Sequence, residues 1–163
     1  MMNVRPVSPD DAAALAAIYN YYVRETVISF ETEALSVEQM RARIVQTAAG
    51  FPYLVCEQDG RVVGYACAHR WKERAASYNQ TWESSIYLHH EWCARGMGRA
   101  LMESLVPLCR EAGCRALIAC ITAENQASVA FHEALGFRQV SLFPAVGCKF
   151  GRLLDVVDLY LPL

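Results

Sequence analysis

The chain has 163 residues, 54% of them hydrophobic, and its 15 basic and 17 acidic side chains leave a net charge of −2. This length predicts a single domain, residues 1–163, with ample apolar side chains for a packed core. The charge excludes a general binder of nucleic-acid backbones, and no run of roughly 20 apolar residues could form a spanning helix, so we expect neither a nucleic-acid nor a membrane partner.

The first half of the chain predicts a strand, two helices and a hairpin. Ser8-Pro9-Asp10-Asp11 supplies an N-cap, a proline at the first helical position and acidic side chains in the first turn. Asp59-Gly60 is typical of a hairpin turn. The side chains expected on the inner face of the first helix are Leu15, Ile18, Tyr19 and Tyr22. The expected elements are a strand at 3–7, a helix at 9–24, an irregular loop or short strand at 26–35, a helix at 36–50 and strands at 53–57 and 61–70.

The second half predicts alternating strands and helices. A glycine-rich segment follows a strand and opens a helix that Gly113 closes. Pro107 lies inside this helix and removes one of its hydrogen bonds, so we expect a kink there. The expected elements are a polar stretch at 72–79, a strand at 80–88, a helix opened by 95–100 and ending at 112, a strand at 115–122, a helix at 125–135 and strands at 138–146 and 153–161. This order predicts an α/β domain with a mixed sheet.

The segment Arg95-Gly96-Met97-Gly98-Arg99-Ala100, between a strand and a helix, is typical of an anion site. The first turn of a helix carries unpaired N–H groups and the positive end of the helix dipole, and glycines let a phosphate approach the backbone closely. The alternative is that the glycines only turn the chain. The segment is not a P-loop, because G-x-x-x-x-G-K-[ST] is missing, and Leu101 replaces the third glycine of the dinucleotide fingerprint.

The cysteines and histidines predict neither disulfides nor a metal site. Seven cysteines are scattered without C-x-x-C spacing, which indicates reduced thiols. His89, His90 and Cys93 lack a fourth metal ligand with suitable spacing. The first residues contain no apolar run flanked by basic residues, so we expect a cytoplasmic protein. The cysteines expected in the core are Cys56, Cys67 and Cys120.

The element order and the pattern R-x-x-G-x-A at 95–100 resemble the GNAT superfamily of acyl-CoA-dependent N-acetyltransferases, whose signature is [QR]-x-x-G-x-[GA]. Motifs throughout the chain resemble the phosphinothricin acetyltransferase-like branch of that superfamily. They are Ile18-Tyr19-Asn20, Ser29-Phe30-Glu31, the block 78–87 with Thr81, Glu83 and Tyr87, the run Asn125, Ser128, His132-Glu133 and Gly136-Phe137, and Gly147, Lys149-Phe150-Gly151 and Asp155. The resemblance implies a GNAT-type α/β fold, a mixed, largely antiparallel, twisted sheet of about seven strands flanked by four helices.

The same resemblance implies that acetyl-CoA is the co-substrate and that no metal is needed. The backbone of residues 86–88 would pair with the pantetheine arm, and the start of the helix would hold the pyrophosphate, which fits the anion site inferred from the glycines. The residues expected to bind acetyl-CoA are Ile86, Tyr87, Leu88, Arg95, Gly96, Met97, Gly98, Arg99, Ala100, Leu101, Asn125 and Ser128.

Glu83 and His132 are the catalytic candidates. In the resembling family this glutamate acts as general base through a water, and partial burial would raise its pKa from about 4.3 into a useful range. His132 falls where many GNAT enzymes place a tyrosine that protonates the departing thiolate, and it could do that or serve as a second base. The structural alternatives are an ion-paired strand glutamate and a histidine packed on a helix face. A strand N–H near Tyr87 or Leu88 would hold the oxyanion.

The acceptor pocket is expected beside the polar stretch before the strand at 80–88. Arg74 could grip a carboxylate or phosphinate through its planar guanidinium, although a solvated loop would show the same composition. Trp82 and Leu154 depart from the usual pattern of the branch, which leaves the exact acceptor open. Lys149 and Asp155 are expected to be structural, as a salt bridge. The residues expected to bind the acceptor are Phe30, Lys72, Arg74, Tyr78, Glu83, Ser84 and Ser85.

Together with the resemblance, these features predict an acetyl-CoA-dependent N-acetyltransferase. The sequence does not fix the oligomeric state, but the resemblance implies a homodimer. The acetyl group would go directly to the amine of a small amino-acid-like acceptor of the phosphinothricin or methionine sulfoximine type. A protein or peptide N-terminal acetyltransferase would need an open groove, whereas Phe30, Tyr78 and Trp82 favour an enclosed pocket. A non-catalytic acyl-CoA-binding module would keep Gly96 and Gly98 but would not need Glu83.

Overall fold

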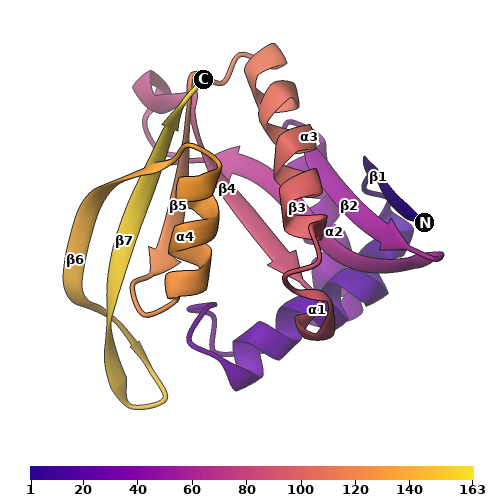
Figure 1. Cartoon of the computed structure of the whole chain (residues 1–163), viewed down its shortest axis with the longest axis horizontal. Helices are drawn as coiled ribbons and strands as arrows, with labels where there is room; N and C mark the ends of the chain where they lie inside the picture. The colour runs from indigo at the N-terminus through magenta and orange to yellow at the C-terminus, as the bar shows by residue number, and fades with distance from the viewer.

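The computed structural model describes residues 1–163, which form a seven-stranded sheet with four α-helices (Figure 1). The strands are β1 (Met2–Pro6), β2 (Tyr53–Gln58), β3 (Arg61–Arg70), β4 (Thr81–Leu88), β5 (Ala116–Thr122), β6 (Arg138–Lys149) and β7 (Arg152–Pro162). The helices are α1 (Ala12–Glu25), α2 (Val37–Ala48), α3 (Met97–Glu111) and α4 (Gln126–Ala134). In the order β1-β2-β3-β4-β5-β7-β6, only the pair β4 and β5 is parallel. The predicted mixed, largely antiparallel sheet is therefore confirmed.

The predicted N-cap at Ser8 forms as the sequence indicates. The Ser8 N–H donates to the Asp11 carboxylate at 2.7 Å, and a short 3-10 turn leads from there into α1. Ser36 and Gln39 form a second capping box at the start of α2. The segment 26–35 between these helices contains no strand, so the irregular loop is the correct one of the two sequence alternatives.

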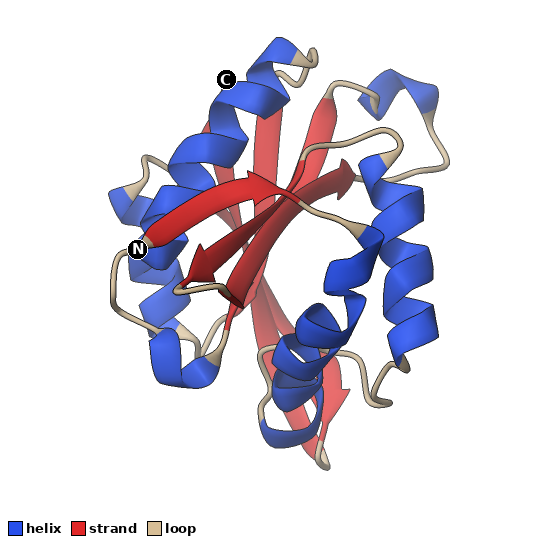
Figure 2. Ribbon diagram, turned by 90° about the vertical axis from the view of Figure 1, so that its right-hand side faces the viewer, coloured by secondary structure: helices blue, strands red, loops and turns tan.

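Two hydrophobic clusters lie on opposite faces of the sheet, and helices cover both (Figure 2). α1 and α2 pack on one face, while α3 and α4 pack on the other. Pro107 lies within α3, which continues past it to Glu111, and the kink stays a prediction. No helix combines the length and the apolar composition needed to cross a bilayer. The predicted inner-face side chains of α1 are all buried, namely Leu15, Ile18, Tyr19 and Tyr22.

The parallel strands β4 and β5 diverge soon after they meet. Their pairing covers only Thr81–Glu83 of β4 and Ala116–Ile118 of β5. From Ser84 to Leu88, β4 has a neighbour only on the β3 side, and Figure 1 shows the ends of the two strands pointing apart. A gap in the sheet therefore exposes one backbone edge of β4.

β6 and β7 form a long hairpin with a bulge. The register shifts between Phe143 and Gly147, where β6 carries extra residues. Within the bulge, Ala145 has a φ of +56°, and its N–H donates to Asp155 at 2.8 Å. β6 therefore extends beyond the predicted end at 146, because a bulged strand continues its pairing after the irregular residues.

Lys149, near the end of β6, is buried and holds two segments of backbone together. Its ammonium donates to the carbonyl of Ser29 at 2.5 Å and to that of Tyr22 at 3.4 Å. Burial lowers the pKa of Lys149 below its ordinary value. The expected salt bridge to Asp155 is wrong, because both side chains are committed to backbone partners.

Candidate active site

Unpaired backbone amides surround the start of α3. Ala94 and Gly96 adopt left-handed conformations, with φ of +59° and +84°. The first helical hydrogen bond runs from the Ala100 N–H to the Gly96 carbonyl at 3.0 Å, and the amides of residues 94–99 donate to no acceptor within the chain. Successive N–H groups around a left-handed residue make a concave anion site, which the helix dipole strengthens. The geometry suits a diphosphate.

The close packing around Gly98 explains the small residue. A Cβ at this position would lie 3.3 Å from Phe131 Cζ, which is tighter than most Cβ contacts, and 3.5 Å from Leu88 Cδ1, which is an ordinary contact. Met97 and Leu101 point into the core, so they offer only backbone to a ligand. Packing against the core therefore constrains which side chains can stand at the start of α3, in addition to any constraint from ligand binding.

The two arginines beside the loop have local partners. The Arg95 guanidinium lies 4.8 Å from the centre of the Trp92 ring, and Arg99 donates to Glu103 at 3.0 Å. Both arginines bring positive charge close to the unpaired amides. The predicted anion site thus combines backbone donors with nearby cations.

A groove of about 510 Å³ runs from this loop along the exposed edge of β4. The His89 N–H donates to the Val63 carbonyl of β3 at 2.8 Å. Because N–H groups alternate along a strand, those of Ile86 and Leu88 are directed away from β3 and into the groove. The Tyr22 hydroxyl donates to the Leu88 carbonyl at 2.5 Å. The edge of β4 therefore offers amides to an extended ligand.

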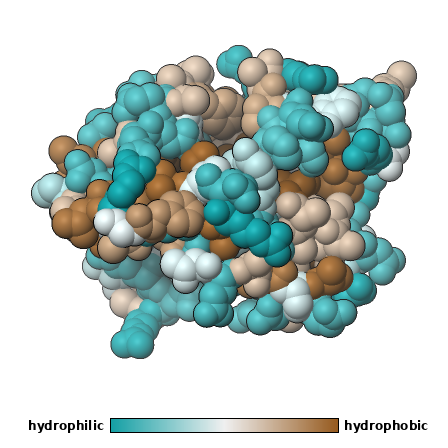
Figure 3. All heavy atoms as spheres, turned by 90° about the horizontal axis from the view of Figure 1, so that it is seen from below, coloured by the Kyte–Doolittle hydropathy of each residue, from teal (hydrophilic) through white to brown (hydrophobic).

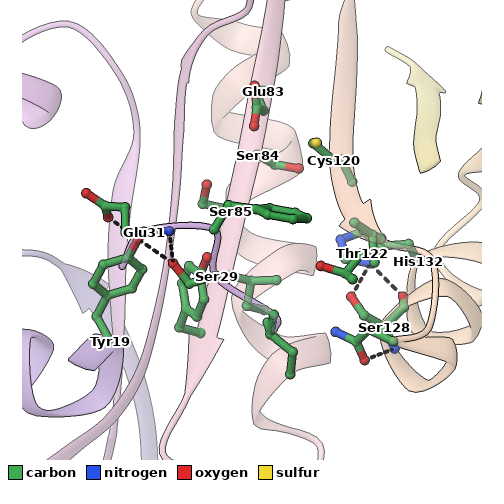
Figure 4. Close-up of a pocket in the computed structure, with 17 residues that line it drawn as sticks. Tyr19, Ser29, Glu31, Glu83, Ser84, Ser85, Cys120, Thr122, Ser128 and His132 are labelled. Atoms are coloured by element: carbon green, nitrogen blue, oxygen red, sulfur yellow. Dashed lines mark hydrogen bonds between the residues drawn. The ribbon is translucent and has the colours of Figure 1, made fainter. Parts of the chain in front are cut away.

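A cavity of about 350 Å³ opens where β4 and β5 diverge. Figure 4 shows Glu83, Ser84 and Ser85 following one another along β4, opposite a second group of side chains from β5 and α4. The residues that line both this cavity and the groove are Ile28, Ile86, Tyr87, Asn125 and Ser128. Two ligands, one in each space, would meet at these shared walls.

Glu83 is a partly buried carboxyl group in this cavity. Burial raises the pKa of Glu83 above its ordinary value, Asp158 raises it further, and His69 opposite it on β3 lowers it. None of the ion pairs in the chain includes Glu83. The alternative of an ion-paired strand glutamate is therefore wrong, and a carboxylate with a raised pKa suits a general base.

His132 lines the same cavity from α4 and is 3% exposed. Its Nδ1 lies 2.8 Å from the Ser128 carbonyl, which requires a proton on Nδ1, and its ring packs edge-on against Phe131 and Phe137. Burial lowers the pKa of His132, so the ring is neutral at pH 7 and Nε2 carries a lone pair. In this tautomer His132 can accept a proton at Nε2 but has no proton there to donate.

The acetyltransferase (GNAT) family model matches residues 15–137, from α1 to just beyond α4. The chain belongs to the GNAT family. The matched region contains the loop of unpaired amides, Glu83 and His132, so the predicted resemblance to GNAT enzymes is confirmed.

Individual GNAT relatives are similar over nearly the whole chain. Phosphinothricin N-acetyltransferase of Alcaligenes faecalis is 41% identical over 162 residues, which cover 98% of this chain and 82% of the relative. The L-methionine sulfoximine/L-methionine sulfone acetyltransferase of Salmonella typhimurium is 33% identical over 163 residues, 99% of this chain and 95% of the relative. The yncA protein of Salmonella typhimurium, solved with its cofactor acetyl-CoA, superposes with a TM-score of 0.97 at 33% identity and covers 100% of this chain and 94% of that structure.

Sequence reasoning missed a charged network on one side of the GNAT cavity. Arg43 donates to both carboxylate oxygens of Glu31, to one of them at 2.8 Å, and the Tyr19 hydroxyl also donates to Glu31. The Arg43 hydrogen bonds lower the pKa of Glu31, so this carboxylate stays charged, whereas burial raises the pKa of Tyr19 to about 12. The motif Ser29-Phe30-Glu31 marked the position, but Arg43 belongs to no motif.

The residues predicted to bind the acceptor fall into two groups. Phe30, Glu83, Ser84 and Ser85 line the cavity together, and the Ser84 hydroxyl is buried without a hydrogen-bond partner. The others lie outside the cavity, on the segment between β3 and β4. There the Lys72 ammonium lies 4.5 Å from the Trp71 ring centre and 5.6 Å from that of Tyr78, and Arg74 is exposed.

Trp82 does not enclose the cavity as the sequence suggested. It is buried in the core, where its ring meets Phe51 edge-on with centroids 5.0 Å apart, and its Nε1 donates to the Asn79 carbonyl at 2.8 Å. Side chains alternate along a strand, so Trp82 and Glu83 lie on opposite faces of β4. Of the three bulky residues expected around the pocket, only Phe30 lines it.

Cys120 is exposed and lines the cavity, so its expected place in the core is wrong, whereas Cys56 and Cys67 are buried as predicted. The divergence of β4 leaves this part of β5 uncovered. Desolvation within the cavity and the carboxylates of Glu83 and Asp158 raise the pKa of Cys120 to about 12. Its sulfur therefore stays protonated at neutral pH, unlike a nucleophilic thiolate.

The histidines after β4 form a stack of rings. His89 lies on His90 with centroids 4.7 Å apart, and His90 lies on Tyr21 at 4.0 Å. No three His, Cys, Asp or Glu side chains are arranged to hold a metal ion. The stacked rings place these two histidines in packing contacts with each other and with Tyr21.

Proposed function

We propose that this GNAT acetyltransferase transfers the acetyl group of acetyl-CoA directly to the amine of a small, amino-acid-like acceptor. The observation that carries the proposal is the junction of two spaces at Ile86 and Tyr87, one leading to the loop of unpaired amides and the other containing Glu83. The activities named for the phosphinothricin and methionine sulfoximine relatives support this acceptor class. A cavity of about 350 Å³ suits a small molecule better than a peptide chain.

For acetyl-CoA, the backbone would supply most of the contacts. The amides of residues 94–99 would hold the diphosphate, and one of the two amides of Ile86 and Leu88 would pair with the pantetheine arm, which leaves the other for the acetyl oxygen. Asn125 and Ser128, at the junction of the two spaces, would contact the cofactor near its reactive end. Acetyl-CoA supplies an acetyl group activated as a thioester.

For the transfer itself, Glu83 would accept the proton of the acceptor ammonium, directly or through a water. An amide at the β4 edge, from Ile86 or Leu88, would stabilise the negative charge that develops on the acetyl oxygen. The neutral amine nitrogen would bond to the acetyl carbon, and the C–S bond would then break. His132 would accept at Nε2 the second proton that the acylated nitrogen loses and pass it to the departing thiolate. The protonated state of Cys120 supports direct transfer without an acyl-enzyme.

For the acceptor, Phe30, Ser84 and Ser85 are proposed to form the walls of its site. Lys72, Arg74 and Tyr78 stay candidates for acceptor binding from the neighbouring segment. All three lie outside the cavity of one chain.

We further propose that the protein is a cytoplasmic homodimer, as a single domain over residues 1–163. All seven cysteines are free thiols, which fits a reducing compartment. Figure 3, which views the end of the molecule where the β6–β7 hairpin turns, shows hydrophobic residues in a band across a mixed surface. Exposed apolar patches of this kind mark interaction surfaces. The exposed large hydrophobic residues of the hairpin are Val140, Leu142, Phe143, Val146, Phe150 and Leu153.

The test is thiol release from acetyl-CoA across amino acids and their sulfone, sulfoximine and phosphinate analogues. We expect turnover of phosphinothricin or methionine sulfone above that of ordinary amino acids, with mass spectrometry locating the acetyl group on the amine. Calorimetric binding of acetyl-CoA without turnover of any amine would instead indicate an acyl-CoA-binding module.

A further inference from the structure

The acceptor cavity offers carboxylates but no cationic side chain. Its charged lining residues are Glu31 and Glu83, and no lysine or arginine lines it. These carboxylates suit the amine of an acceptor. An amino acid or a phosphinate analogue also carries an acidic group, whose oxygens need hydrogen-bond donors once they leave water.

A recess of about 250 Å³ continues from the acceptor cavity on the face of the sheet that α2 covers. Tyr19, Ser85 and Tyr87 line both spaces, so a molecule of amino-acid size can extend from one into the other. In contrast to the cavity, the recess has no carboxylate in its lining. Each of its polar side chains can donate a hydrogen bond.

Two tyrosines in the recess carry hydroxyl groups without partners. Tyr53 and Tyr65 are 7% and 4% exposed, their ring centroids lie 5.9 Å apart, and neither hydroxyl forms a hydrogen bond within the chain. Burial raises the pKa of both phenols, so both keep their protons and can donate. The Ser84 hydroxyl is fully buried without a partner, whereas the two tyrosine hydroxyls face the open space of the recess and are free to donate to an acceptor atom supplied from outside the protein.

Arg43 of α2 supplies positive charge to the recess. It uses N–H groups on both terminal nitrogens for Glu31, yet a guanidinium has five donors, and 46% of this side chain is exposed. The guanidinium lies 5.9 Å from the centre of the Tyr19 ring, at the wall between cavity and recess. Its remaining donors are available to an acidic ligand.

We propose that the recess formed by Arg43, Tyr53 and Tyr65 binds the acidic group of the acceptor, a carboxylate or phosphinate, while its amine lies beside Glu83. This inference rests on the proposed acetyltransferase function and narrows its acceptor class to amines with an acidic group within reach. It differs from the expectation that Arg74, on the exposed segment before β4, holds that group.

Four amines test the proposal and separate the two possible acids. They are phosphinothricin, its decarboxylated analogue, methionine, and 3-(methylthio)propylamine, which has no acid. For acid-bearing amines we expect Tyr53→Phe and Tyr65→Phe each to raise the acceptor KM about 3- to 10-fold, and Arg43→Gln about 10- to 30-fold, with KM for acetyl-CoA unchanged. The acid-free amine should not distinguish these variants from wild type. The acid whose removal abolishes the effect is the one bound in the recess.

Arg41→Gln is the matched control. It removes a guanidinium from the same helix, but Arg41 pairs with Asp10 at 3.7 Å and does not line the recess, so its KM values should equal those of wild type. The two Tyr→Phe variants keep the rings, and they test the recess even if Arg43→Gln loosens the loop through Glu31. Arg74→Gln tests the competing location.

The proposal is overturned if the three recess variants leave KM unchanged for every acid-bearing amine, or raise it equally for the amine without an acid. A thermal-shift titration with phosphinothricin measures binding of the acceptor in the recess independently of turnover. Stabilisation by phosphinothricin that is lost in Tyr53→Phe and Tyr65→Phe supports the recess, and its absence in wild type contradicts it. Failure of every amine to turn over, despite such stabilisation, would count against the acetyltransferase function alone.

Discussion

The two halves of the active site are made of different parts of the chain. The proposed acetyl-CoA half consists mainly of backbone, the amides of residues 94–99 and the edge of β4. The proposed acceptor half consists of side chains, with Glu83, His132 and the Glu31 network around one cavity. Backbone sites depend on conformation and tolerate many side chains, whereas the chemistry of the acceptor half depends on a few residues. Substitutions should therefore separate cofactor binding from turnover.

Glu83→Gln should give the largest effect. Loss of a general base costs about 100- to 1,000-fold in kcat, whereas the affinity for acetyl-CoA should stay at the wild-type value. Thiol-release kinetics and calorimetry measure the two quantities separately. Unchanged turnover would remove the base assignment, and weakened cofactor binding would break the division between the two halves.

His132→Asn should lower kcat about 10- to 100-fold. Asparagine can keep the donor to the Ser128 carbonyl but has no counterpart of Nε2, so the change isolates proton transfer from packing. The variant should bind acetyl-CoA as wild type does. A kcat equal to that of wild type would assign His132 to packing on the helix face.

The same variant tests the charge state of the buried ring. Because the pKa of His132 is lowered in the folded state, the unfolded chain binds its proton more readily below about pH 6.5. The free energy of unfolding should therefore fall in wild type as pH drops from 7 to 5.5, and fall less in His132→Asn. Urea unfolding at both pH values measures this difference, and equal losses would mean that the folded protein accepts the proton freely.

Gly96→Ala should weaken acetyl-CoA binding about 10-fold. Gly96 has a φ of +84°, and a Cβ there meets nothing within 4 Å, so backbone strain is the only direct effect. Gly113, with a φ of +94° and equally open surroundings, lies after the other end of α3. Each glycine-to-alanine change should lower the free energy of unfolding by roughly 1 kcal/mol. Gly113→Ala should nevertheless keep the wild-type affinity for acetyl-CoA in calorimetry. Equal affinities for both variants would contradict a backbone-built cofactor site.

Cys120→Ser should have the smallest effect, less than about 2-fold in kcat. A thiol with a pKa of about 12 is almost entirely protonated at neutral pH and cannot carry the acetyl group efficiently. Steady-state kinetics with phosphinothricin checks this. A loss of tenfold or more would indicate that the side chain takes part in the transfer.

The sequence predicted the elements and the loop of unpaired amides because their signals are local. Ser8, Ser36 and Gly96 act on their immediate neighbours, so caps and turns are visible in short windows. The acceptor half depends on contacts between distant segments. Arg43 and Glu31 meet only because α2 packs beside the loop, and Lys149 binds carbonyls 120 and 127 residues away.

Cys120 shows why the burial of a strand side chain was predicted wrongly from the sequence. Its neighbours Ala119 and Ile121 are buried, and the three residues together have the pattern of a core strand. Whether that face is covered depends on where β4 leaves β5, and the pairing ends at Glu83. No feature of the strand itself encodes that point.

The bulge in β6 has a consequence for the solubility of the protein in crowded conditions. β6 is a 12-residue strand at the edge of the sheet, the kind of edge on which foreign strands can grow. Ala145 turns its backbone out of the strand path, and its N–H is already taken by Asp155. The row of edge amides is therefore interrupted midway, which protects the molecule from amyloid-like extension even though its hairpin is rich in exposed apolar side chains.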